Sequence, residues 1–249
     1  MIAVAPRHGS QAPAWPISHY LKPLFAAACL CGSAPAASEV GASVSLFSDA
    51  RLRGYSLSSG HPVGTINLSY DDPAGVYGAV SASAVIGDED AIEPLGLQLN
   101  AGYAKRLPSS LAVDFGVTHS SYSKYGSRGT TSYTEIYAGV SRKALSTRIS
   151  YAPHYFESGS STLYAELNAN FSPMTKLNLF GHAGVLIPLS HQNDLRQLRT
   201  QHDWSVGASR QVGRISLHAI LSGGGPDGDY YHDRYHSRTK LVLGVSSPL

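Results

Sequence analysis

The sequence is poor in three features on which many folds depend: cysteine, charge and long apolar runs. Its 249 residues include only 2 cysteines, Cys29 and Cys31, so the body of the chain has no thiol for a disulfide. Charged residues make up 14% of the chain and the formal net charge is +2, which gives no basic surface for nucleic acid. Apolar runs of about 18 residues are absent, so we expect no membrane-spanning helix.

The N-terminal segment has the layout of a secretory signal peptide. Residues 1–20 contain no acid, an apolar run follows at 24–32, and the first acid is Glu39. The small-residue site Ala34-Pro35-Ala36 lies between the apolar run and this acid. We therefore expect residues 1–37 to be a cleaved signal peptide that takes both cysteines with it, and residues 38–249 to form one domain.

The stretch from Ala42 to Ser58 alternates strictly between two kinds of residue. One set is small or apolar, whereas the other includes Asp49, Arg51 and Arg53. Strict alternation predicts a strand whose two faces meet different media. A soluble β-sandwich would fill the apolar face with bulky side chains, and here that face is thin. This stretch therefore favours a barrel strand that turns its apolar face to lipid and its charges to the lumen.

The same alternation recurs along the chain, and no helical period competes with it over a long window. It predicts about twelve strands, near residues 42–57, 62–70, 75–86, 94–106, 110–121, 131–142, 145–154, 161–171, 175–188, 201–211, 214–223 and 239–248. Tight turns are expected at 71–74, 107–109, 143–144, 172–174 and 212–213, and longer loops at 87–93, 122–130, 155–160, 189–200 and 224–238.

Short and long connections therefore alternate, which is typical of outer-membrane barrels with short periplasmic turns and longer extracellular loops. We predict an all-β fold, a transmembrane antiparallel β-barrel with both termini on the periplasmic side. Its expected lipid-facing side chains are apolar in mid-strand, and they include Leu95, Leu97, Leu99, Val113, Phe115, Leu177, Leu179, Leu217 and Leu221.

The opposite faces of these strands are polar. Our candidate channel-lining residues are Asp49, Arg51, Arg53, Asp114, Glu135, Arg148, Glu166, His182, Asp203 and His218. Neighbouring strands contribute Glu135, Arg148 and Glu166, whose alternating signs predict a paired ladder. Arg51 and Arg53 should both point inward from the first strand and stack along the axis. Complete pairing with acids would close the lumen, whereas pairs on opposite walls would create a transverse field; we expect the second.

Two groups of residues raise the question of catalysis or metal binding. His182 and His218, with Asp203 and Ser205 on the strand between them, form the nearest approach to a catalytic cluster. The loop at 224–238 is rich in tyrosine and carries metal-type ligands at Asp229, His232, Asp233 and His236. We interpret the first group as lumenal polarity and the second as an irregular surface loop. No enzyme activity, cofactor or metal is expected.

Three segments resemble a known family. Residues 48–58, Ser-Asp-Ala-Arg-Leu-Arg-Gly-Tyr-Ser-Leu-Ser, resemble the opening strand of the TorF family of porins. The tract 68–77 resembles the second strand and turn of that family, and the stretch 241–246 resembles its C-terminal end. The chain departs from the family pattern at Ala50 and Leu52, where aromatics are usual, and it ends in Leu249 instead of an aromatic. The resemblance implies an outer-membrane barrel and supplies no catalytic residues.

The sequence thus predicts a porin-like channel in the bacterial outer membrane that passes small hydrophilic or charged solutes through a narrow polar lumen. The alternatives are a barrel anchor that presents surface-binding loops, and an outer-membrane lipid hydrolase. The expected partners are outer-membrane lipids and lipopolysaccharide, small solutes and the outer-membrane assembly machinery, without nucleic acid.

Overall fold

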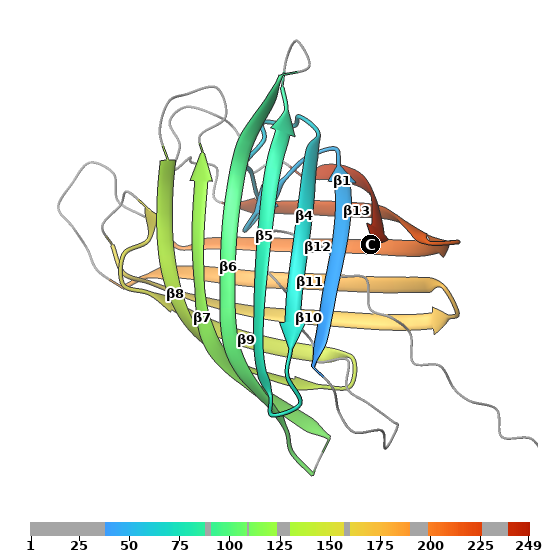
Figure 1. Ribbon diagram of the computed structural model, residues 1–249. Coiled ribbons are helices and arrows are strands. Elements are labelled where there is room, and N and C mark those ends of the chain that lie inside the picture. Colours follow the sequence, from blue (N-terminus) through green and yellow to red (C-terminus); the bar gives the residue numbers. More distant parts are fainter. Residues whose placement is uncertain are drawn as a thin grey trace, which may run out of the picture.

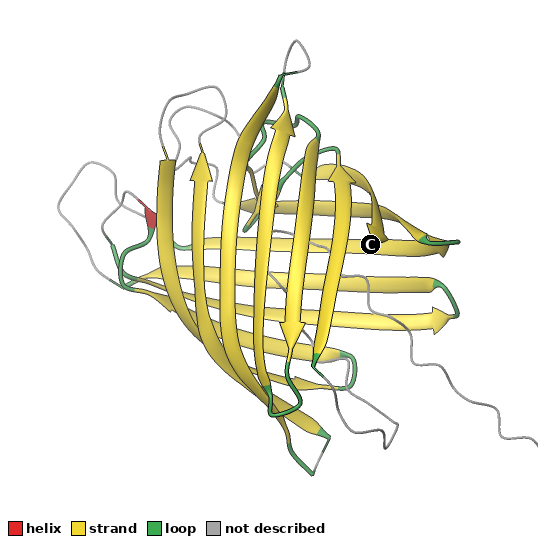
Figure 2. Cartoon of the chain, in the orientation of Figure 1, coloured by secondary structure: helices red, strands yellow, loops and turns green. Residues whose placement is uncertain are grey.

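The computed structural model describes residues 38–87, 91–108, 110–123, 130–156, 160–189, 199–225 and 239–249. Within these ranges, twelve antiparallel strands close into a single barrel. Figure 1 shows how the strands are arranged around it. Figure 2 shows that strands make up nearly all of the described chain. The barrel strands are β1 (Glu39–Phe47), β4 (Val63–Asp71), β5 (Val76–Ile86), β6 (Ile92–Arg106), β7 (Leu111–Ser123), β8 (Thr130–Arg142), β9 (Leu145–Ala152), β10 (Thr162–Met174), β11 (Leu177–Pro188), β12 (Gln201–Val212), β13 (Ile215–Gly225) and β14 (Lys240–Pro248).

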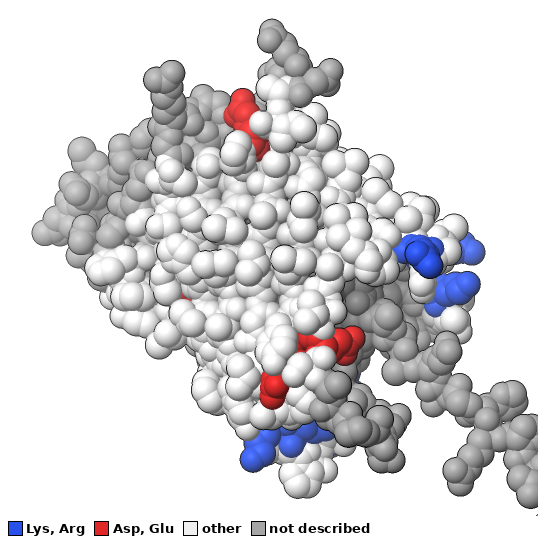
Figure 3. All heavy atoms as spheres, in the orientation of Figure 1, with Lys and Arg blue, Asp and Glu red and all other residues white. Residues whose placement is uncertain are grey.

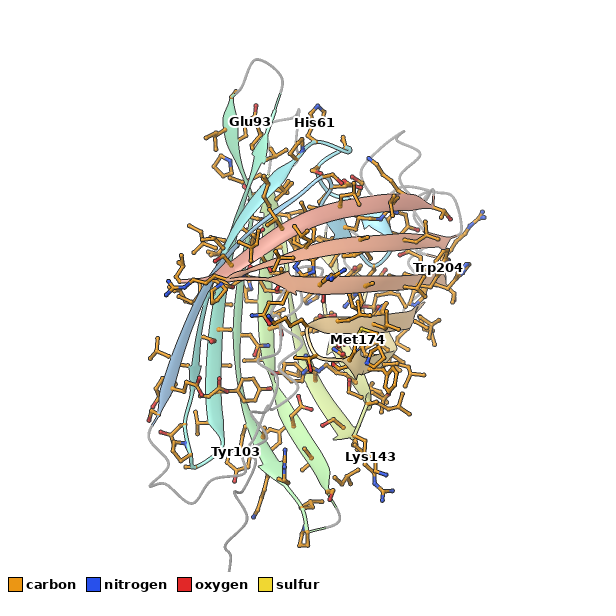
Figure 4. All side chains as sticks on the ribbon, turned by 90° about the vertical axis from the view of Figure 1, so that its right-hand side faces the viewer. His61, Glu93, Tyr103, Lys143, Met174 and Trp204 are labelled. Carbon is orange, nitrogen blue, oxygen red and sulfur yellow. The ribbon has the colours of Figure 1, made fainter. Side chains whose placement is uncertain are left out.

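Each strand pairs with its sequence neighbours, and β1 closes the ring by pairing with both β4 and β14. The predicted fold class is therefore confirmed, and most strand boundaries agree with the expected ranges to within a few residues. The two ends of the barrel are distinct in Figure 4, where Glu93 and His61 lie at one end and Tyr103 and Lys143 at the other. Among the described residues, no helix has the length and apolar character needed to cross a bilayer.

The outer surface of the barrel is apolar. Large side chains point outward and are strongly exposed, among them Ile66, Leu68, Phe115, Ile136, Ile149, Leu167, Leu179, Val206, Leu217 and Leu243. Figure 3 shows a broad uncharged band across the wall, with charged side chains toward its ends. Exposed apolar surface on this scale is unfavourable in water and suits the hydrocarbon of a bilayer, where a closed barrel leaves no strand edge unpaired.

The first strand is shorter than predicted. β1 ends at Phe47, and the second half of the expected strand 42–57 folds into the barrel as a small hairpin of β2 (Arg51–Leu52) and β3 (Tyr55–Ser56). Glycines with positive φ at Gly54 and Gly60 permit these turns, since that backbone region is open to glycine. The predicted strand was too long because the residues of the hairpin are also extended, so the alternation of apolar and polar residues continues past the end of β1.

Leu95 faces inward, not outward as predicted. On β5, Ser83 pairs with Gly96 and Ala84 with Pro94, so the register skips Leu95. Such a bulge re-aims a side chain to the other face of the sheet. Leu95 is fully buried against Val63 and Val85.

The turn between β10 and β11 also differs from its prediction. β10 runs through Pro173 to Met174, and the turn is at residues 175–176 instead of 172–174. A register shift between Phe171 and Met174 accommodates the proline, which has no N–H for the ladder. Lys176 adopts a φ of 70° and completes the turn.

Candidate functional site

The lumen is crossed by the connection between β1 and β4. We call residues 48–62 the inner loop. Its internal structure depends on the buried Asp49 carboxylate, which accepts hydrogen bonds from the hydroxyls of Ser56 and Ser58 and from the N–H of Gly60. A buried carboxylate needs such donors to offset its lost hydration. The inner loop is therefore a folded unit that is held together from within.

Arg51 belongs to this internal network. Its guanidinium lies 3.3 Å from the Asp49 carboxylate and donates to the carbonyl of Gly54. The predicted stack of Arg51 and Arg53 along a single strand is thus wrong. The two side chains leave a hairpin, not a barrel strand, and they have different contacts.

The tip of the inner loop rests against the wall at β12 and β13. A Cβ added to Gly54 would lie 2.9 Å from the Cα of Gly224 and 3.1 Å from the Cβ of Asp203. Gly54 also has a φ of 84°, so both its conformation and its surroundings require glycine. The tip therefore contacts strands that lie two and three places from β1 in the closed ring.

Arg53 docks the inner loop onto the wall. Its guanidinium forms an ion pair with Glu135 on β8, 82 residues later in the chain. The same guanidinium lies 4.0 Å from the ring centroid of Tyr164, 4.9 Å from that of Tyr155 and 5.7 Å from that of Tyr133. We call Glu135 and these three tyrosines the tyrosine cage. Aromatic faces and a carboxylate together stabilise a desolvated cation.

An apolar cluster surrounds the cage and occupies the lumen at this level. It consists of Leu52, Tyr122, Tyr133, Ala152, Tyr155, Tyr164 and Leu186, with Leu57 and Phe156 against it. Leu52 comes from the inner loop, Tyr155 comes from the connection after β9, and the other buried members come from wall strands. Burial of these side chains holds the inner loop in place by the hydrophobic effect.

A partly buried arginine lies on β9. Arg148 forms an ion pair of 2.8 Å with Asp114 on β7, and its guanidinium lies 4.1 Å from the ring centroid of Tyr137. The Tyr77 hydroxyl lies 2.5 Å from that of Tyr137 and 3.4 Å from the Asp114 carboxylate. Tyr137 in turn donates to the side-chain carbonyl of Asn100 at 3.2 Å. These contacts link five consecutive strands, β5 to β9, along one side of the lumen.

The predicted ladder of Glu135, Arg148 and Glu166 is only partly present. Arg148 is the register partner of Glu166, but on its other side it faces Gly139. Glu135 forms its ion pair with Arg53 instead, because the inner loop places the Arg53 guanidinium against the lumenal face of β8. The ladder prediction was therefore wrong for Glu135.

A small polar cavity separates the two arginine sites. It has room for about one ordered water and is lined by Gln98, Thr118, Glu135, Tyr137, Arg148, Ser150 and Glu166. Within the described part of the chain, the side-chain carbonyl of the buried Gln98 has no hydrogen-bond partner. The cavity thus presents hydrogen-bond acceptors, among them two carboxylates, to a water or a cationic group inside it.

His182 and Asp203 belong to a third network. The Nε2 of His182 lies 2.7 Å from the Asp203 carboxylate, and its Nδ1 lies 2.7 Å from the side-chain oxygen of Asn168. The Tyr164 hydroxyl donates to the same carboxylate at 3.0 Å. Ser205 is the register partner of His182, but both ring nitrogens already have partners. A serine nucleophile needs one of these nitrogens as its base.

His218 lies apart from this network. It is opposite Ser209, six residues along β12 from Asp203, which corresponds to about 20 Å of strand. Its Nε2 lies 2.8 Å from the hydroxyl of Ser246, and its ring packs against Phe47. The structure therefore does not bring the two histidines together.

The other sequence-based candidate was the loop at 224–238. Of it, residues 226–238, with Asp229, His232, Asp233 and His236, lie outside the described residues. In the part of the chain that is described, no group of three or more histidine, aspartate, glutamate or cysteine side chains could hold a metal ion.

Comparison with known proteins connects this barrel to bacterial outer-membrane proteins. The NanC porin superposes with a TM-score of 0.55 at 12% identity, covering 85% of this chain and 100% of that one. The KdgM porin gives a TM-score of 0.50 at 11% identity, covering 84% and 98%. These likenesses show the fold, and with the apolar outer band they assign the barrel to the bacterial outer membrane.

Sequence comparison supplies the family. No curated protein matches the chain. Residues 32–224 match a family described as a bacterial protein of unknown function, Gcw_chp, whereas the TorF name rests on resemblance alone. The chain therefore belongs to the Gcw_chp family, with the fold of an outer-membrane porin.

Proposed function

We propose that the protein is an outer-membrane channel for small hydrophilic, charged solutes, with the inner loop as its constriction. The observation that carries the proposal is the placement of Arg53, which extends from the inner loop to Glu135 on a distant strand and so spans the lumen. A connection that only closed the barrel end would have no need to bring charge into the interior.

The buried charges support a transport role. Asp114, Glu135, Glu166 and Asp203 all project from the wall into the lumen, together with Arg148. Ionisable groups at membrane depth are costly and are characteristic of solute pathways. A barrel that served only as an anchor could fill its lumen with apolar or neutral side chains at lower cost.

Passage of a solute requires Arg53 to leave the tyrosine cage, because Arg53 and the surrounding apolar cluster occupy the lumen at that level. Single-channel recording in planar bilayers tests this. Arg53→Ala should raise the open probability or the conductance relative to wild type, whereas Arg106→Ala, at the periplasmic end of β6, should leave both unchanged. If neither wild type nor Arg53→Ala conducts, the barrel is an anchor and the channel proposal fails.

We also propose that residues 1–37 are removed as a signal peptide, and that the assembly machinery of the outer membrane inserts the barrel. The layout of small residues before Glu39 supports the first point. N-terminal sequencing of protein purified from the membrane should find a first residue near Ala37 or Ser38.

A further inference from the structure

We propose that the tyrosine cage is a binding site for a solute that carries a guanidinium group, and that Arg53 occupies the place of that solute in the described state. The inference rests on the proposed channel function and names the class of solute. Three observations support it: the contacts between the cage and Arg53, the negative charge of Glu135 that remains when Arg53 moves out, and the small movement needed to exchange Arg53 for a solute.

The cage recognises the charge and flat shape of a guanidinium more than its full set of donors. Three tyrosine faces and the Glu135 carboxylate surround Arg53. Within the described residues, its Nε and Nη1 atoms are buried without a hydrogen-bond partner. Contacts of this kind depend on a planar, weakly hydrated cation, which any guanidinium supplies. They do not depend on the attachment of that group to the inner loop.

An empty cage would be unfavourable. Without Arg53, the Glu135 carboxylate would be buried without its cation, and buried unpaired charge is strongly destabilising. Arg148, which lines the same cavity as Glu135, is already paired with Asp114. Glu166 lines the adjoining cavity, so the surroundings add negative charge. A cationic solute in the cage would pair with Glu135 and so offset the free-energy cost of moving Arg53 out, whereas an anion would increase that cost.

The exchange requires only the Arg53 side chain to move. The inner loop is stabilised by Asp49 with Arg51, Ser56 and Ser58, and none of these contacts includes Arg53. The loop can therefore keep its fold while Arg53 leaves and returns.

Isothermal titration calorimetry of detergent-solubilised barrels with methylguanidinium tests the proposal. Arg53→Ser should bind the probe saturably and at least tenfold more tightly than wild type, because the competing side chain is gone. The double variant Arg53→Ser/Glu135→Gln should lose this binding. Arg106→Ser is the control, since it removes an exposed arginine at the end of β6 and leaves the cage occupied, and it should behave as wild type.

Equal binding to Arg53→Ser and to wild type, or no saturable binding to either, would overturn the proposal. If Arg53→Ser does not fold, the wild-type channel provides the measurement: methylguanidinium should reduce potassium current saturably, and acetate should not. Absence of that reduction also overturns it. Binding without any conductance would instead reject the channel function and leave the cage standing.

Discussion

Ser48 and Leu243 exchange two hydrogen bonds at the point where the chain leaves the barrel wall. The Ser48 N–H donates to the Leu243 carbonyl at 2.9 Å, and the Leu243 N–H donates to the Ser48 hydroxyl at 3.1 Å. The ladder between β1 and β14 ends at the preceding pair, Phe47 and Gly244. The serine side chain thus replaces the next step of the ladder and allows the backbone to turn into the lumen.

Replacement of Asp49 should unfold the inner loop. Asp49→Ala removes the acceptor shared by Ser56, Ser58 and Gly60 and takes the carboxylate from the buried Arg51, so we expect a loss of about 3 kcal/mol in stability. The heat-modifiable gel shift should occur at lower temperature. Glu93→Ala, at an exposed acid, is the control. An unchanged midpoint for Asp49→Ala would show that the contacts of the Asp49 carboxylate contribute nothing to stability.

Substitution of Gly54 should displace the loop tip. Gly54→Ala imposes a strained positive φ and also places a Cβ 2.9 Å from the Cα of Gly224. The strain alone costs on the order of 1 kcal/mol, and the contact adds to it. Gly213→Ala isolates the strain, because Gly213 has a φ of 62° with nothing near its added Cβ. Protease sensitivity and conductance should rise for Gly54→Ala alone, and equal effects in both variants would contradict this.

Ion selectivity should respond in opposite directions to the two members of the Arg53–Glu135 pair. Arg53→Ala leaves Glu135 unopposed and should move the reversal potential in a potassium chloride gradient toward cation preference. Glu135→Gln should move it toward anion preference. A reversal potential that stays the same in both variants, with conductance present, would show that the pair is structural.

Removal of His182 should not affect any lipid hydrolysis. Both of its ring nitrogens have partners, Asp203 and Asn168, so none is oriented toward a serine as a base. Purified wild type and His182→Ala should show equal background in lipase and deacylase assays. Activity in wild type that disappears in His182→Ala would establish the hydrolase alternative.

Asp72, in the turn between β4 and β5, should make stability depend on acid pH. The N–H of Ala74, followed by the hydroxyls of Ser38 and Tyr70, holds the pKa of the Asp72 carboxyl below its usual value. Because the folded pKa is depressed, this stabilisation is present above the unfolded pKa and is lost as pH falls through the folded pKa. The difference in unfolding temperature between wild type and Asp72→Asn should therefore shrink below about pH 4.

The wall of the barrel was predictable because its environment is periodic. Lipid on one side and a polar lumen on the other impose a two-residue alternation, which located strands such as β8 and β13 from sequence alone. The predictions were wrong in two places: where the alternation continues in a segment that is not a barrel strand, and where a bulge interrupts it. The alternation passes unbroken into the β2–β3 hairpin, and the bulge at Leu95 interrupts it.

Most pairings within the site could not be predicted. Arg53 and Glu135 are 82 residues apart and meet only because the inner loop turns inward, which no local pattern encodes. One signal was available: a strand over 42–57 is longer than the about 9–11 residues that cross a bilayer. Gly54 falls in the excess, and Gly60 follows shortly after the predicted strand. The tyrosines of the cage come from two strands and a loop, so their convergence needs the closed barrel.

The seam between β1 and β14 has a consequence for biogenesis. During synthesis, Leu243 emerges after almost every other part of the chain, although the segment that it holds is among the first. The partner Glu135 likewise follows Arg53 by many residues. We therefore expect the inner loop of the nascent chain to stay unanchored until β14 pairs with β1. Closure of the barrel and placement of the inner loop in the lumen would then occur in the same step. Chains truncated before β14 should then expose the segment around Arg53 to protease.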